Sequence, residues 1–145
     1  MRVVKVFFLS LIAVFAVLTS SAETLNYKGT FSVYSEETSF EVMEVKFNIT
    51  LDLATSKAKF STVGMQFGPG MPVGLTIDFS NIPFTKDDKG EYLFEQETTG
   101  KPTANGEPFG NTRLRNFYAQ TDKNTISVTF DAGSKMAVYE GEKCN

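Results

Sequence analysis

Apolar and polar residues alternate along most of the chain, and a period of two predicts β-strands. Residues 24–35 and 39–52 show this alternation most clearly. In the second segment the phase slips by one residue at Met43-Glu44, which predicts a β-bulge that bends a long strand. Six further strands are predicted at residues 56–67, 72–80, 91–98, 111–121, 124–131 and 134–140.

Gly, Pro, Asn and Asp separate the predicted strands, so most of the connections are short turns. Two connections are longer, at residues 81–90 and 98–110. Short turns between successive strands favour an up-and-down path, and an eight-stranded antiparallel meander removes its exposed edges by closing. We therefore predict an all-β fold, an eight-stranded antiparallel up-and-down barrel. A two-sheet β-sandwich fits the same pattern and is the alternative.

Residues 1–22 have the pattern of a secretory signal peptide. Two cations precede an uncharged run from Val6 to Leu18, and small residues end at Ala22. This run is shorter than the roughly 20 residues that a membrane-spanning helix needs. We expect an exported protein, periplasmic or extracellular, whose residues 23–145 form a single domain without a membrane span.

The net charge bears on the choice of partner. Removing the signal takes away two of the 14 cationic residues and none of the 17 acidic ones, so the net charge changes from −3 to −5. Nucleic-acid-binding domains present a basic face. We therefore expect no nucleic acid partner.

Cys144 is the only cysteine of the chain. It excludes an internal disulfide, so the domain relies on its apolar core. We expect an unpaired thiol on a mobile tail rather than an intermolecular disulfide.

The residue types argue against an enzyme. The chain has no histidine, which removes Ser-His and Cys-His nucleophile pairs and imidazole metal ligands. Glu95 and Glu97 lie roughly 7 Å apart on one predicted strand, a separation that inverting glycosidases use, but an exposed strand face has the same spacing. Residues 87–90 lack the ligand spacing of a calcium loop and predict a hairpin turn closed by Gly90. We predict a non-enzymatic protein with no cofactor and no metal.

The glycine-rich residues 68–74 mark the candidate ligand site. Their spacing is G-x-G-x-x-x-G and a strand follows, whereas a phosphate loop needs G-x-G-x-x-G before a helix. They therefore predict a rigid hairpin turn, and in an up-and-down barrel this turn shares one end with residues 98–110. Met65, Phe67 and Met71 flank the turn, and Phe and Met line adaptable apolar pockets as well as ordinary cores.

Polar candidates for the same site lie on the strand predicted at residues 111–121. Arg113 and Arg115 are predicted to share a face with Phe117, and two cations beside a ring suit an anionic headgroup. Pairing with surface acids is the alternative for these arginines. Tyr118 is a further candidate for orienting a ligand at the rim.

The chain resembles a known group of proteins in its export signal, its first strand with Tyr27-Lys28-Gly29-Thr30-Phe31, its eight short strands and Thr121-Asp122. These features are similar to the calycin-like and lipocalin-like β-barrel proteins that gut bacteria secrete. The resemblance implies a small closed barrel whose open end is ringed by four loops.

We expect a binding barrel that holds a small apolar or amphipathic ligand at this open end. Burial against Phe and Met side chains would supply affinity at about 25 cal/mol per Å² of apolar surface. The alternative is a protein-interaction module, an inhibitor or an envelope-assembly partner, that uses the loop Thr98 to Gly110 and has a solid core.

Overall fold

The computed structural model describes residues 22–68, 70–71, 75–108 and 113–144, and this part of the chain is built of strands and turns. The predicted signal peptide up to residue 21 lies outside the described residues, so export stays a prediction. The strands are β1 Ala22–Tyr34, β2 Ser39–Asp52, β3 Lys57–Val63, β4 Thr76–Lys86, β5 Tyr92–Thr98, β6 Thr103–Ala104, β7 Glu107–Pro108, β8 Leu114–Thr121, β9 Thr125–Ala132 and β10 Lys135–Lys143.

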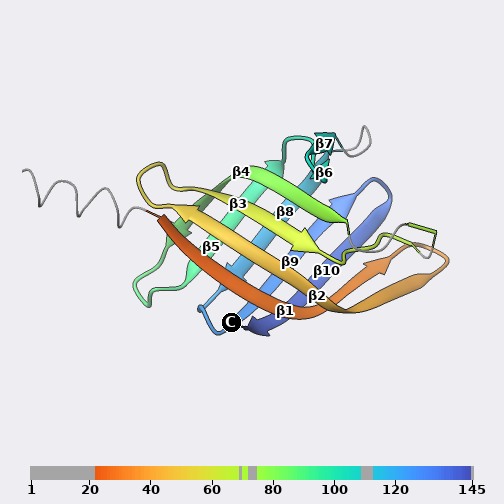
Figure 1. Ribbon diagram of the computed structural model, residues 1–145, viewed down its shortest axis with the longest axis horizontal. Coiled ribbons are helices and arrows are strands. Elements are labelled where there is room, and N and C mark those ends of the chain that lie inside the picture. Colours follow the sequence, from red (N-terminus) through yellow and green to blue (C-terminus); the bar gives the residue numbers. More distant parts are fainter. Residues whose placement is uncertain (1–21, 69, 72–74, 109–112, 145) are drawn as a thin grey trace, which may run out of the picture.

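Eight of these strands form a closed antiparallel barrel (Figure 1). Their order is β3-β2-β1-β10-β9-β8-β5-β4, and β3 closes the barrel by pairing with β4. Each long strand pairs with its neighbour along the chain, and β1 pairs with β10. The predicted all-β up-and-down barrel is therefore confirmed, and the sandwich alternative is not observed.

The predicted bulge in β2 is present at the expected residues. The register with β1 shifts between Gly29 and Phe31, which lie opposite Val45 and Val42. Glu44 adopts a φ of 64°, which turns the chain by one residue and restores the inward phase at Val45. The bulge lets β2 curve around the barrel, and the Val45 carbonyl next to it accepts a hydrogen bond from the buried Tyr139 hydroxyl at 2.9 Å.

The fourth predicted strand has different bounds in the structure. The sequence pattern predicts a strand at residues 72–80 and a long connection after it, whereas β4 begins at Thr76 and continues to Lys86. Asn81 has a φ of 60°, and this irregularity resets the alternation so that Ile82 and Phe84 face inward. Pro83 and the break in alternation at Asn81 suggest a loop in the sequence pattern. In the structure β4 bends at this point and does not end. The turn predicted at residues 87–90 is confirmed, with the Asp87 carboxylate accepting hydrogen bonds from the Lys89 and Glu91 backbone amides.

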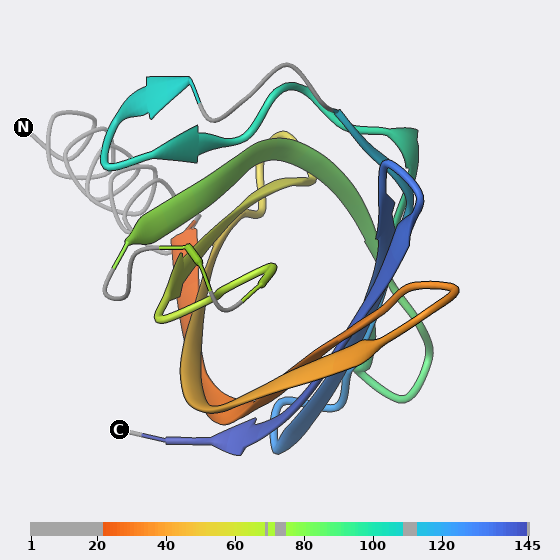
Figure 2. The same cartoon turned by 90° about the vertical axis from the view of Figure 1, so that its right-hand side faces the viewer.

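A hairpin lies within the second long connection, for which the sequence predicts no strand. Strands β6 and β7 pair with each other, and β6 adds to the edge of β4 through Ile77 opposite Ala104. Figure 2 shows this hairpin outside the ring of barrel strands. Asn105 fixes it, because its N–H donates to the Thr76 carbonyl and its Oδ1 accepts from the Thr76 amide.

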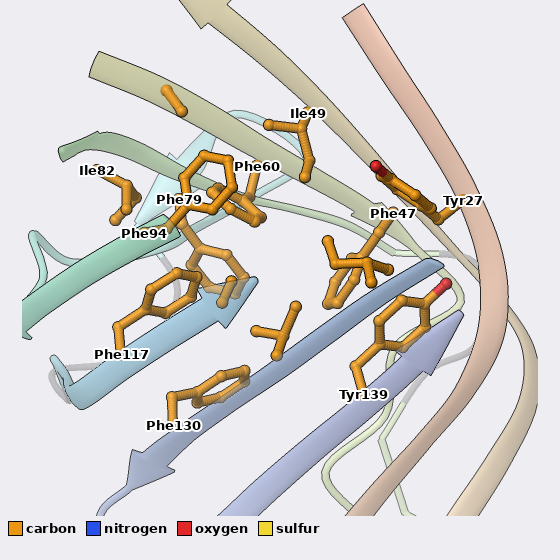
Figure 3. Packing of buried hydrophobic residues seen from close by; sticks show 14 of the residues in the cluster. Tyr27, Phe47, Ile49, Phe60, Phe79, Ile82, Phe94, Phe117, Phe130 and Tyr139 are labelled. Atoms are coloured by element: carbon orange, nitrogen blue, oxygen red, sulfur yellow. The ribbon is translucent and has the colours of Figure 1, made fainter. Parts of the chain in front are cut away.

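Aromatic rings fill the interior of the barrel (Figure 3). Phe60 packs edge to face on Phe94 and Phe117, with centroids 5.0 and 5.1 Å apart. Phe117 stacks on Phe130 at 6.0 Å, and Phe130 lies 6.2 Å from Phe31. Offset and edge-to-face pairs of this kind add to the free energy gained by burial. The described interior is thus a continuous packed core.

Candidate functional site

One end of the barrel carries the features that the sequence singled out. The connections β1–β2, β3–β4, β5–β8 and β9–β10 share this end, as an up-and-down path requires. Figure 2 shows the β3–β4 connection reaching over part of the ring of strands. We call the described residues of this connection, 64–68, 70–71 and 75, the strap. The strap lies over part of the barrel end that the sequence predicted to be an open mouth.

The described part of the strap is held together by its own hydrogen bonds. At its base the Gly64 amide donates to the Leu75 carbonyl at 3.4 Å. Further along, the Met71 amide donates to the Gly68 carbonyl at 3.2 Å, and Gln66 Nε2 donates to the Met71 carbonyl at 3.0 Å. The hairpin turn predicted at residues 68–74 lies mostly outside the described residues, so it stays a prediction. Residues 69 and 72–74 lie outside the described part.

The three predicted apolar site residues come together at this end. Met65 is fully buried, and Phe67 and Met71 are partly buried against the core. The Phe67 ring packs edge to face on Phe31 at 5.5 Å and lies 6.4 Å from Phe130. The Phe67 amide is 3.4 Å from Met71 Sδ. We call the surface that Phe31 and Phe130 present to this ring the Phe67 seat.

A cation that sequence reasoning missed also reaches the strap. Lys135 begins β10, and its Nζ donates to the Phe67 carbonyl at 3.2 Å in an exposed position. Its register partner is Ala132, which lies opposite Leu114 on β8. Lys135 therefore shares the rim with the start of β8. Nothing in the local pattern marks Lys135, because the contact joins residues 68 positions apart.

The polar site residues predicted on β8 face outward. Arg113 and Arg115 are exposed, whereas Phe117 is buried, so the expectation that they share one face is wrong. Asn116 explains the difference, because its φ of 53° accompanies a register shift between Arg115 and Tyr118. This bulge places two outward residues in succession and turns Phe117 into the core.

Arg115 and Tyr118 differ in their distance from the rim. Arg115 lies opposite Asp131 and directly follows Leu114, the β8 residue that is level with Lys135. Tyr118 lies further down the outer wall, where it is paired with Glu95 and its hydroxyl donates to Gln120 Oε1 at 3.4 Å. Tyr118 is therefore not placed to touch a ligand at the strap, whereas Arg113 and Arg115 remain at the same rim as Lys135.

The opposite barrel end is closed by polar contacts. The Thr121 hydroxyl donates to the Thr125 carbonyl at 2.6 Å, so the Tyr27 hydroxyl, 2.5 Å away, donates to Thr121. The Tyr92 hydroxyl donates to Glu23 at 2.9 Å. Burial, and then the hydrogen bond and charge of Glu23, raise the pKa of Tyr92 to about 12. These groups serve structure, and the two ends of the barrel differ in chemistry.

A groove of about 660 Å³ runs over the outer face of β1, β10 and β9. Its acidic residues are Glu91, Asp122, Glu140 and Glu142. Asp122 has a structural role there, since its carboxylate accepts the Asn124 and Thr125 amides at 2.8 Å, which lowers its pKa. Among the residues that the structure describes, no group of three or more acids, cysteines or histidines is arranged to hold a metal ion.

Two further sequence expectations are placed by the structure. Glu95 and Glu97 are both exposed on β5, on the outside of the barrel. Cys144 is a free cysteine in this single chain, and the expected lack of an intermolecular disulfide stays a prediction. The expected mobile tail is not observed at this residue. Cys144 is half-buried and its backbone amide donates to the Asn26 carbonyl at 2.9 Å, which continues the sheet beyond β10.

A scan against protein-family models found no matching family, and searches of curated proteins and of solved structures found no match. No part of the described chain forms a helix with the length and apolar character needed to cross a membrane. Any account of function therefore depends on the geometry of the strap and its surroundings.

Proposed function

We propose that this protein is an exported, non-enzymatic barrel that binds a small apolar or amphipathic molecule at the end that the strap partly covers. One observation supports the proposal. The Phe67 seat is an apolar surface at the end of the barrel, and the ring that fills it comes from a connection and not from a strand. Because Phe67 does not belong to a strand, its ring can leave the seat without breaking a sheet pairing.

The energy required for this exchange is modest. Fully burying a phenylalanine side chain gains about 1.5–3 kcal/mol, and Phe67 is only partly buried. Taking out a wall residue such as Phe130, which is 1% exposed, would cost about 3–5 kcal/mol. A ligand whose hydrocarbon chain covers Phe31 and Phe130 therefore offsets the burial free energy that is lost when the Phe67 ring is displaced. The deeper rings of the core stay in place.

Binding is tested with the purified chain and a fluorescent fatty acid, together with mass spectrometry of an organic extract. We expect saturable binding of one probe per chain. Phe130→Leu, which shrinks the seat, should weaken binding several-fold, at roughly 1.4 kcal/mol per tenfold. Tyr118→Ala on the outer wall is the matched control and should bind as the wild type does. Absence of probe uptake and of any extractable ligand would refute the proposal.

A second candidate function is protein interaction, and the β6–β7 hairpin favours it. The hairpin stands outside the closed barrel, and Lys101 and residues 105–108 are exposed. The packed interior fits this candidate, because a solid core needs no ligand. Exchanging the charges of Lys101 and Glu107 should abolish capture of a partner without a loss of stability. Capture that is unchanged by this exchange would count against the hairpin as the contact surface.

A further inference from the structure

We propose that Phe67 and Lys135 hold the place of an anionic amphiphile in the ligand-free barrel. The Phe67 ring occupies the position of the hydrocarbon chain, and the Phe67 carbonyl occupies the position of the headgroup on Lys135. This inference rests on the proposed function. It adds the chemical class of the ligand and the part of the chain that competes with it.

The Phe67 seat is the apolar part of the proposed binding site. Phe31 and Phe130 are 0% and 1% exposed with the ring of Phe67 in place. Their centroids lie 5.5 and 6.4 Å from that of Phe67, so displacing the ring uncovers both. Water is a poor substitute at such a surface. A hydrocarbon chain makes the same apolar contact with Phe31 and Phe130 as the Phe67 ring does, and it does not need to have the shape of a ring.

Lys135 is the polar part of the proposed binding site. Its Nζ is exposed and donates to a neutral carbonyl, although an ammonium group bonds more strongly to a carboxylate or phosphate oxygen. A headgroup that replaces the Phe67 carbonyl would therefore improve this bond. Arg115 lies two strands away along the same rim, roughly 10 Å at the usual spacing of strands, with Asp131 on the strand between them. The positive charge on the rim that favours an anionic headgroup over a cationic one is therefore that of Lys135 itself.

The contacts that Phe67 makes with the barrel strands lie where the ligand would bind. The described internal hydrogen bonds of the strap, among Gln66, Gly68 and Met71, do not involve the barrel strands. The Phe67 ring and carbonyl reach β1, β9 and the start of β10. A ligand that takes over these contacts competes with Phe67 directly. Removing the ring should then increase affinity, which is the opposite of what a wall residue would do.

The decisive variant is Phe67→Ala, assayed by titration with a fluorescent fatty acid. We expect binding roughly 10- to 100-fold tighter than wild type, because the internal competitor is gone. Met136→Ala, an exposed apolar residue on the neighbouring position of β10, is the control and should leave affinity unchanged. Weaker binding by Phe67→Ala with normal binding by wild type would overturn this inference and leave the proposed function standing. No binding by either protein would overturn both.

A second variant reports on the ring itself. The chain contains no tryptophan, so Phe67→Trp introduces a single tryptophan at the seat, whose emission can be excited apart from that of the five tyrosines. We expect its emission to shift to the red when dodecanoate binds, because the indole moves from the core into water. An unchanged or blue-shifted emission on saturation would show that residue 67 stays in the site, and would overturn the inference even if Phe67→Ala does not fold.

The headgroup is tested with Lys135→Met. This change should lower affinity for dodecanoate about tenfold and leave affinity for dodecanol unchanged, since only the carboxylate uses the ammonium group. In the wild type, dodecanoate should bind more tightly than dodecylamine. An equal loss for the acid and the alcohol, or a preference for the amine, would overturn the assignment of the headgroup to Lys135.

Discussion

The backbones of β1 and β10 approach each other closely at Gly29. A Cβ added there would overlap the carbonyl oxygen of Glu140, which belongs to the backbone and has no freedom to rotate away. On the partner strand, a Cβ at Gly141 would meet the Tyr139 hydroxyl, whose bond to the bulge carbonyl of Val45 fixes its position. Two facing glycines therefore permit the coiling of the sheet next to the β2 bulge.

Gly29→Ala should destabilise the fold by about 3 kcal/mol, because two backbones must move apart. Gly100→Ala is the matched control. An added Cβ there has no atom within 4 Å, so stability should stay within about 0.5 kcal/mol of wild type. Urea unfolding of the three proteins measures both values. Equal midpoints for Gly29→Ala and Gly100→Ala would contradict the close approach.

At the scale of elements, small irregularities decide which side chains enter the barrel. Asn81 in β4 and Asn116 in β8 both have positive φ, 60° and 53°, and each resets the alternation of its strand. Asparagine tolerates this region better than most residues. The β6–β7 hairpin depends on a third asparagine, Asn105, with a φ of 51° and two hydrogen bonds to Thr76.

Asn105→Ala should release the hairpin from β4 without unfolding the barrel. The change removes the 3.0 Å side-chain bond to the Thr76 amide and strains a backbone with positive φ, a combined effect of about 1–2 kcal/mol. Hydrogen exchange at the Thr76 amide should speed up, while amides of β1 and β10 exchange as before. Asn105→Gly, which keeps the backbone relaxed, should show a smaller effect. Identical exchange in both variants would contradict this role.

At the scale of the whole molecule, buried tyrosines tie the barrel wall together. Tyr27, Tyr92 and Tyr139 are at most 1% exposed and come from three different strands. Burial raises the pKa of all three phenols, because the charged phenolate is poorly solvated inside the protein. The neutral forms donate hydrogen bonds that join β1 to β8, β5 to β1 and β10 to β2.

This arrangement predicts a loss of stability at high pH. A tyrosine in the unfolded chain ionises near its ordinary pKa of 10, whereas folded Tyr92 holds its proton up to about 12. The contribution of Tyr92 to the free energy of unfolding is therefore complete below about pH 10 and is lost as the pH rises towards 12. Denaturant unfolding across this range should show a smaller loss for Tyr92→Phe than for wild type. Tyr118→Phe, on the exposed wall, should behave as wild type; a parallel decline in all three proteins would contradict the prediction.

Much of the architecture follows from the sequence alone. Alternation of apolar and polar residues determined the eight barrel strands, the phase slip determined the bulge at Met43-Glu44, and the acidic-glycine pattern determined the turn at residues 87–90. These are local properties, set by side-chain period and backbone preference. Composition adds one constraint of its own, because a chain without histidine has no imidazole base or ligand in any fold.

The candidate site depended on tertiary structure. The pattern placed Met65, Phe67 and Met71 near one end, but it could not show that their connection lies over part of that end. It also placed Phe117 on the same face as Arg113 and Arg115, because the bulge at Asn116 leaves a weak local signal. The contact between Lys135 and Phe67 joins segments 68 positions apart, and only closure of the barrel brings them together. Local sequence specifies which residues alternate, whereas strand register and closure decide which of them meet.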